Sequence, residues 1–204
     1  MDYFYHIFYG ILMAYLGLIS PGMLNMTALK ISMNTGKYEA LKFSIGASLV
    51  VFFQAGIALY FADYFTKNPK VIANLKIAAI FIFFALAVFF FMLSRKDLKP
   101  KTTNKKGNFF IKGILMSSIN MLAIPFYLGI SIYLSSKSKI IIEQPYIILF
   151  VFGASLGSFL IFYTYMIFAN IINGKVSFIA KNINFILSLL FLFLAIFTLI
   201  KILP

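Results

Sequence analysis

The sequence predicts an all-α integral membrane protein in which six transmembrane helices form two inverted three-helix repeats. The first observation is composition, because 62% of the 204 residues are hydrophobic and only 11% are charged. The second is a set of apolar windows that are long enough to cross a bilayer. The third is that short segments of the first half return, in the same order, in the second half.

A helix needs roughly 20 mostly apolar residues to cross the hydrocarbon core of a membrane. The windows that meet this length are Tyr3–Leu29, Tyr38–Ala62, Val71–Leu93, Phe109–Leu134, Tyr146–Ile171 and Phe178–Leu203. Strands of a membrane barrel would instead be about ten residues long and would alternate apolar with polar side chains. Because these windows are longer and uniformly apolar, we predict a helical bundle.

Recurring segments indicate that the chain is one unit present twice. Gly10-Ile11-Leu12-Met13 returns as Gly113-Ile114-Leu115-Met116, and Gly46-Ala47-Ser48-Leu49 returns as Gly153-Ala154-Ser155-Leu156, at offsets of 103 and 107 residues. In the third segment, Asn74 lies 13 residues before Ala87, and Asn182 lies 13 residues before Ala195. This pair therefore recurs at an offset of 108 residues. Chance matches in apolar sequence are the alternative, but the shared order and near-constant offset favour duplication.

We therefore predict a single transmembrane domain over residues 1–204. Repeat one covers about 1–94, a linker about 95–108, and repeat two about 109–204. Each repeat contains three helices, which is an odd number, so the second repeat should enter the membrane from the opposite side. Such inverted repeats are typical of secondary transporters, whose binding site lies near the midplane between interrupted helices.

Lys and Arg residues predict the orientation, because they are retained on the cytoplasmic side. The loops after the first, third and fifth windows carry 12 of the 18 Lys and Arg residues, and the opposite side carries six. Both termini should thus lie outside, with loop 95–108 in the cytoplasm. These loops also account for the net charge of +13. A nucleic-acid interface would need a basic face with base-reading or stacking residues. The long loop offers Lys with Thr, Asn and Gly instead, so no nucleic-acid partner is predicted.

Helix breakers occur at related positions of the two repeats. Pro21-Gly22 and Pro125 follow the two Gly-Ile-Leu-Met segments by 11 and 12 residues. Proline removes a backbone donor and its ring clashes with the carbonyl four residues earlier. In hydrocarbon the freed carbonyls need other partners, so irregular backbone should line protein or a cavity. We predict a helix break at each position.

Four polar residues are the predicted substrate-binding residues. Ser20 and Asn25 lie near the first break, Asn120 lies near the second, and Gln54 is a long polar side chain within the second apolar window. A carboxamide both donates and accepts hydrogen bonds, which suits a zwitterionic or multiply polar solute. The alternative is that these groups only bond between helices, at about 0.6 kcal/mol each. Because polar residues accompany both of the repeat-related breaks, function is favoured.

Small residues in the second and fifth windows predict close helix packing. Gly153 and Gly157 form a GxxxG spacing, which is typical of packing within a bundle or at a dimer contact.

No catalytic residue, metal site or cofactor is predicted. The chain has no cysteine and one histidine, His6. No predicted helix carries an acid, a base and a nucleophile together, so we expect no enzyme. The carboxylates all fall at helix ends or in loops, which leaves no buried proton relay. Asp63, at the outer end of the second window, is the carboxylate that could bind a proton near a vestibule. The alternative is that Asp63 only marks a helix end at the membrane interface.

The stretch Gly17-Leu18-Ile19-Ser20-Pro21-Gly22, followed by Thr35-Gly36-Lys37 and the window containing Gly46, resembles the LysE/RhtB-type amino-acid exporters. The resemblance covers essentially the whole chain. The sequence departs from the family signatures at Met23, where a second proline is typical, and at Met121-Leu122, where Pro-Lys is typical.

This resemblance implies a secondary transporter in the bacterial inner membrane that exports amino acids or related small metabolites. It also implies a six-helix protein in contact with the lipid bilayer and allows a homodimer. Combined with the predicted breaks, it leads us to expect alternating access at a midplane site. The alternative function is a membrane scaffold or assembly subunit that transports nothing and uses the GxxxG face.

Overall fold

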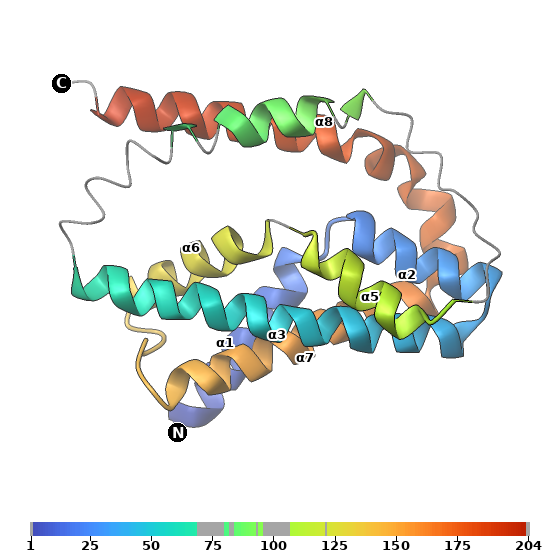
Figure 1. Ribbon diagram of the computed structural model, residues 1–204, viewed down its shortest axis with the longest axis horizontal. Helices are drawn as coiled ribbons and strands as arrows, with labels where there is room; N and C mark the ends of the chain where they lie inside the picture. The colour runs from blue at the N-terminus through green and yellow to red at the C-terminus, as the bar shows by residue number, and fades with distance from the viewer. Residues whose placement is uncertain are drawn as a thin grey trace. The chain divides into compact units, whose positions relative to one another are not determined.

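The described part of the chain is helical, without strands. The computed structural model describes residues 2–68, 80–81, 84–92, 94–95, 107–120 and 122–202. Its helices are α1 (Asp2–Gly17), α2 (Met23–Asn34), α3 (Lys37–Lys67), α5 (Phe109–Ser118), α6 (Ala123–Ser136), α7 (Tyr146–Ile167) and α8 (Ala169–Ile202) (Figure 1). Most of the predicted window Val71–Leu93 and residues 96–106 of the predicted linker lie outside the described residues.

Helix boundaries differ from the predicted windows in three places. The first and fourth windows are each divided into two helices, α1 with α2 and α5 with α6. The loop predicted between the fifth and sixth windows is wrong, because α8 begins at Ala169 after a turn at Phe168 and continues through residues 172–177. Polar residues can interrupt an apolar stretch without ending a helix. A single glycine such as Gly174 lowers helix stability by only about 1 kcal/mol relative to alanine.

Length and apolar composition identify candidate membrane spans among the described residues. Helices α3 and α7 each qualify, and α5 with α6, bent by 65° at the break, qualify as a third. Helix α1 has 16 residues and α2 has 12, so neither alone reaches the length of a full span. The count of six helices and the inverted topology stay predictions.

The chain forms two compact units. The first comprises Met1–Thr66 and Lys106–Lys175, and the second comprises Lys67–Lys105 and Val176–Pro204. Each unit thus combines corresponding parts of both predicted repeats. In the second unit the Ser188 hydroxyl donates to the Ala87 carbonyl at 2.9 Å, and the rings of Phe90 and Phe191 stack with centroids 5.8 Å apart. The third segments of the two repeats therefore contact each other.

In the first unit, α1 packs along α7 with direct backbone contact. A Cβ atom added at Gly10 would clash with the backbone of Phe150, and one added at Gly153 would clash with the backbone of Ile7. A Cβ at Gly157 would clash with Ile11 one turn further along. The GxxxG spacing therefore lies in a helix contact within the chain.

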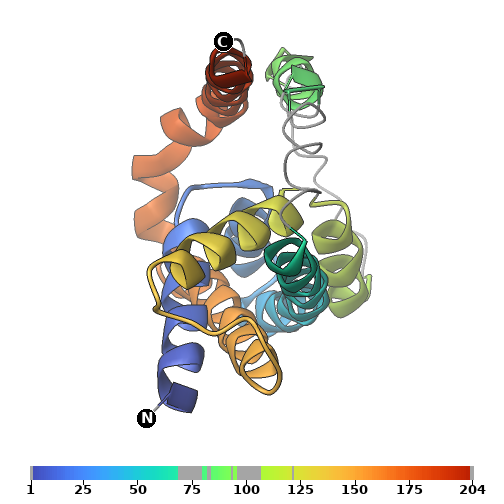
Figure 2. The same ribbon diagram turned by 90° about the vertical axis from the view of Figure 1, so that its left-hand side faces the viewer.

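Helix α5 packs on α3 through the equivalent residues of the other repeat. A Cβ atom added at Gly113 would clash with the backbone of Phe43, and one at Gly46 with the backbone of Phe110. Figure 2 shows α1 beside α7 on one side and α5 beside α3 on the other. The first helix of each predicted repeat thus contacts the second helix of the other predicted repeat, and the contacts start from the glycines of the recurring tetrapeptides.

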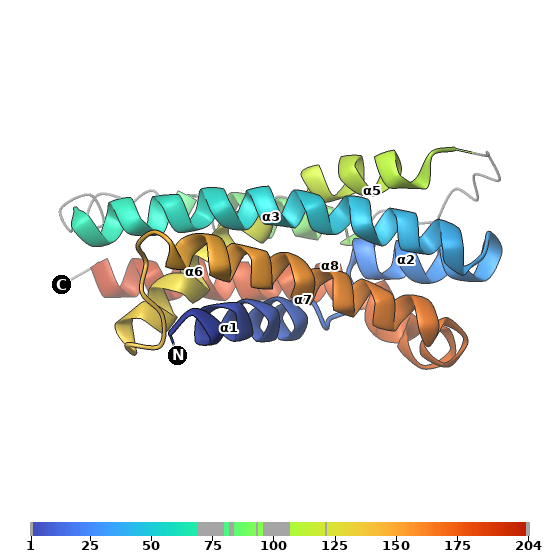
Figure 3. The same cartoon turned by 90° about the horizontal axis from the view of Figure 1, so that it is seen from below.

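The two second helices, α3 and α7, cross at equivalent residues. The Ser155 hydroxyl donates to the Ser48 carbonyl at 2.9 Å, and the helices run in opposite directions (Figure 3). If a twofold axis relates the two predicted repeats, a contact between equivalent residues lies on that axis. Phe43 and Phe150, also equivalent, are both fully buried, each in a different core cluster of the unit.

Candidate functional site

The first break is the non-helical segment 18–22 between α1 and α2. Helix α1 ends at Gly17, whose carbonyl is four residues before Pro21 and therefore meets the proline ring if the helix continues. Pro21 is buried and Gly22 precedes the first residue of α2. The chain turns here, and the carbonyls of residues 18–20 accept no hydrogen bond from a helical N–H.

Side chains supply donors to three successive carbonyls of the first break. The amide Nδ2 of Asn25 donates to the carbonyls of Leu18 at 2.5 Å and Ser20 at 2.7 Å. The hydroxyl of Tyr165, from α7, donates to the carbonyl of Ile19 at 2.8 Å. This arrangement satisfies the requirement that backbone carbonyls freed inside a membrane find other partners.

The second break separates α5 from α6. Helix α5 ends at Ser118 and α6 begins at Ala123. The amide Nε2 of Gln54, from α3, donates to the carbonyl of Ser117 at 3.0 Å and to that of Asn120 at 3.4 Å. A side chain from a second helix thus bridges the end of the interrupted helix, as Tyr165 does at the first break.

Pro125 lies beyond the second break, in the first turn of α6. Because the first N–H groups of a helix have no partner within it, proline is tolerated in this turn. The interruption therefore begins upstream of Pro125, and Pro125 is exposed.

Several polar atoms of the residues at the breaks, and one of α6, are buried and have no hydrogen-bond partner within the described residues. These atoms are Asn25 Oδ1, Gln54 Oε1, Ser117 Oγ and the Tyr127 hydroxyl. Leaving a buried polar group unpaired costs about 1–3 kcal/mol, so each such group in a native protein needs an explanation. A polar ligand is one explanation that fits a pair of interrupted helices.

The predicted substrate-binding residues divide between the two breaks. Ser20 and Asn25 belong to the first, where the Ser20 side chain is exposed and Asn25 is buried. Gln54 and Asn120 meet at the second, where Gln54 is buried and Asn120 is partly exposed. Their contacts thus assign the two residues of each pair to one break.

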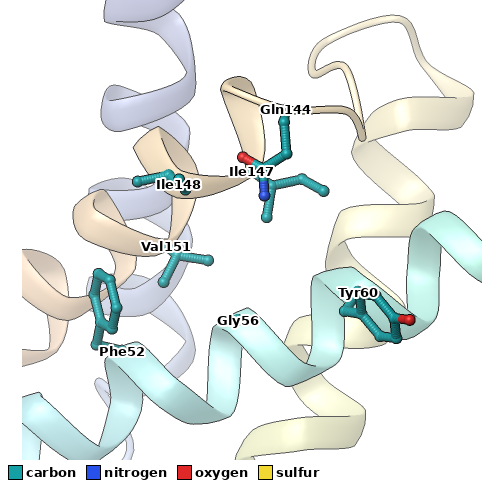
Figure 4. A pocket seen from close by; sticks show the side chains of 7 residues that line it. All are labelled: Phe52, Gly56, Tyr60, Gln144, Ile147, Ile148 and Val151. Atoms are coloured by element: carbon teal, nitrogen blue, oxygen red, sulfur yellow. The ribbon is translucent and has the colours of Figure 1, made fainter.

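A separate cavity of about 210 Å³ lies between α3 and the start of α7 (Figure 4). It is lined by Phe52, Gly56, Tyr60, Gln144, Ile147, Ile148 and Val151. The lining is mainly apolar and includes none of the predicted substrate-binding residues.

Comparison with protein families identifies the chain. The family model of the LysE type translocator matches residues 15–202. The chain belongs to the LysE type translocator family. It is therefore an integral membrane protein and a transporter of amino acids or similar small molecules. The resemblance predicted from the first-helix motif is thus confirmed. No curated protein and no solved structure shows a significant match to the chain.

Tyr165 is the residue of the translocator's breaks that sequence reasoning missed. It lies one helical turn after Ile161, which is the repeat counterpart of Gln54. A search for polar residues within one turn of that counterpart would have found it. The Tyr15 hydroxyl lies 3.2 Å from the Thr164 hydroxyl and pairs with it.

Replacing Tyr165 by phenylalanine is expected to destabilise the first break. The change removes only the hydroxyl that donates to Ile19, and leaving that carbonyl unpaired costs about 1–3 kcal/mol. Thermal unfolding of the purified protein in detergent should show a lower midpoint. Tyr163→Phe, two residues away on an exposed position, is the control and should leave the midpoint unchanged. Equal midpoints for the two variants would contradict the assignment.

Proposed function

We propose that the chain exports amino acids or related small metabolites from the cytoplasm, by alternating access at a midplane site between the two broken helices. The supporting observation is that a carboxamide donates to each break through its NH2 group, while its buried oxygen has no hydrogen-bond partner among the residues that the structure describes. These carboxamides belong to Asn25 and Gln54. The proposed environment is the bacterial inner membrane, with both termini outside and loop 95–108 in the cytoplasm.

The unpaired atoms suit the chemistry of an amino acid. Amide oxygens only accept hydrogen bonds, so Asn25 Oδ1 and Gln54 Oε1 fit the N–H groups of an ammonium. The hydroxyls of Ser117 and Tyr127 either donate or accept, and therefore fit either end of a zwitterion. Gly22 is the N-cap of α2 and supplies no side-chain cap, and the N–H groups at the start of such a half-helix favour a carboxylate.

Matched contacts support alternating access. Glycines at equivalent positions join each first helix to the second helix of the other repeat, and the second helices cross at Ser48 and Ser155. Two arrangements that exchange the roles of the repeats would have similar contacts and similar energies. One arrangement would then open the central site toward one side of the membrane, and the symmetry-related arrangement would open it toward the other side.

The scaffold alternative is less well supported. It relied on an exposed GxxxG face, but backbone atoms of Ile7 and Ile11 cover Gly153 and Gly157 within the chain. A homodimer, if formed, would need a different surface.

Asn120→Ala is expected to lower efflux about tenfold or more while the protein stays folded and inserted. Alanine is the best helix former, so it favours continuing α5 across the break whose carbonyls Gln54 binds. The measurement is efflux of a mass-resolved amino-acid panel from dipeptide-loaded cells. A loss of about 1.4 kcal/mol of stabilisation at the site corresponds to this tenfold change.

Asn108→Ala is the matched control for this experiment. Asn108 accepts from the N–H groups of Phe110 and Ile111 at the start of α5, away from the break, so its loss should cost about 1 kcal/mol of stability and leave efflux unchanged. Normal efflux from Asn120→Ala would contradict the proposed site. If the unmodified protein exports no member of the panel, isolation of a stable partner would favour the scaffold.

A further inference from the structure

His6 holds the connection between α6 and α7 onto α1. It is the chain's single histidine and its side chain is only 2% exposed. Its Nε2 accepts a hydrogen bond from the backbone N–H of Ile141 at 2.8 Å. Its ring lies against that of Tyr146, with centroids 4.6 Å apart. Because a ring nitrogen that accepts carries no proton, the neutral ring must carry its proton on Nδ1.

We call residues 137–145, which join α6 to α7, the outer strap. Ile140 and Ile142 are buried on either side of the exposed Ile141, so the strap is seated by two apolar side chains and by the bond to His6. Helix α6 is the half-helix that follows the second break. A movement of α6 relative to α1 therefore requires the strap to move as well.

We propose that His6 is a proton-operated latch on the predicted outer side of the membrane. A proton from water binds the lone pair of Nε2, the ring gains one positive charge, and no electrons are transferred. Nε2 then becomes a donor that faces the donor N–H of Ile141, so the hydrogen bond breaks and the strap is released. Histidine is the side chain whose charge ordinarily changes between pH 5 and 8.

The surroundings contain other charged and titratable groups. Tyr146 contacts the ring and Tyr3 stacks on Tyr146 at 5.4 Å. Asp2 precedes His6 by one turn of α1. The charged residues of the strap are Lys137, Lys139 and Glu143, and all three are exposed. Water and salt screen the exposed charges of the strap, whereas the change from acceptor to donor at Nε2 acts directly on the hydrogen bond to Ile141.

A link to transport rests on the proposed function. External protons that release the strap would favour opening of the outer side and so would speed export. The proton returns to the outer side when the hydrogen bond to Ile141 forms again, so the latch regulates opening and carries no proton across the membrane.

The latch is tested first without transport. The full chain, carrying a tag without histidine, is labelled with ¹⁵N-histidine in lipid nanodiscs, so that every imidazole signal comes from His6. We expect a neutral ring with the proton on Nδ1 at pH 8 and a doubly protonated ring at lower pH. Hydrogen exchange in residues 139–143, corrected for its intrinsic pH dependence, should become several-fold faster over the same range.

Two variants separate the latch from a structural role. Gln at position 6 accepts a hydrogen bond but does not titrate, so His6→Gln should keep the strap protected at every pH. His6→Phe cannot accept, so it should leave the strap exchanging quickly at every pH. An imidazole that stays neutral down to pH 5, or the same pH course of exchange in His6→Gln and the unmodified protein, would overturn the proposal.

Proteoliposomes test the link to transport. Efflux should accelerate several-fold as the pH on the outer side falls from 8 to 6, and His6→Gln should abolish this dependence. If no solute is transported but protonation still releases the strap, the proposed function fails and the latch stands. If transport occurs with the same pH dependence in His6→Gln, the latch fails and the proposed function stands.

Discussion

Efflux is expected to fall about tenfold or more when Gln54 is replaced by leucine. Leucine is similar in size but cannot donate to the carbonyls of Ser117 and Asn120, which lie 3.0 and 3.4 Å from Nε2. Each carbonyl keeps a backbone donor, the N–H of Asn120 for Ser117 and the N–H of Ala123 for Asn120, but the side-chain hydrogen bonds that join the break to α3 are lost. Such bonds contribute about 0.5–1.5 kcal/mol each, and 1.4 kcal/mol is tenfold in rate. The proposed contact of Oε1 with substrate is lost at the same time. The measurement is the initial efflux rate in proteoliposomes, normalised to inserted protein.

Phe53→Leu is the control for this prediction. Phe53 is the neighbouring residue on α3 and is 60% exposed, so the same helix receives the same new side chain on its outer face. Its efflux should match that of the unmodified protein. A Gln54→Leu variant that transports as fast as Phe53→Leu would rule out a role for Gln54 at the break.

Gly153→Ala is expected to destabilise the first unit by about 1–3 kcal/mol, which is typical of inserting a methyl group into a closely packed contact. The new Cβ would clash with the backbone of Ile7 on α1, and backbone cannot move aside as the end of a flexible side chain does. The equivalent Gly46→Ala, whose Cβ would clash with Phe110, should have a similar effect. Thermal unfolding in detergent should show lower midpoints for both variants.

Gly129→Ala provides the comparison for these two variants. Gly129 is within α6, and an added Cβ there meets nothing within 4 Å. Alanine in a helix interior is more favourable than glycine by about 0.5–1 kcal/mol, so the midpoint should stay the same or rise. If Gly153→Ala and Gly129→Ala unfold at the same temperature, the close contact between α1 and α7 is not needed for stability.

The first break was predictable because its chemistry is local. Pro21 disfavours a helix through Gly17, four residues earlier, and α1 ends there. Asn25 reaches carbonyls only five and seven residues away. The second break was located less well. Pro125 indicated an interruption, but the interruption begins after Ser118, and Pro125 lies in the first turn of α6.

The long-range contacts at the breaks were not predictable from spacing. Gln54 and Asn120 are far apart in the chain, as are Tyr165 and Ile19. Their pairing depends on which helices cross, and uniformly apolar membrane helices contain little periodic pattern from which to infer a neighbour. The recurring glycines predicted close contacts, but the identity of the contacted backbone came from the structure.

The sequence by itself determined that this is an apolar, helical membrane protein of the LysE type translocator family, and it indicated a duplicated chain with breakers at related positions. These properties follow from composition and from the local geometry of proline and glycine, which act within a few residues. Only the tertiary structure decided that each first helix packs on the other repeat's second helix, that Gln54 and Tyr165 reach the breaks, and that His6 accepts from Ile141. Hydrogen bonds are short and directional, so their partners are set only once the chain has brought distant segments together.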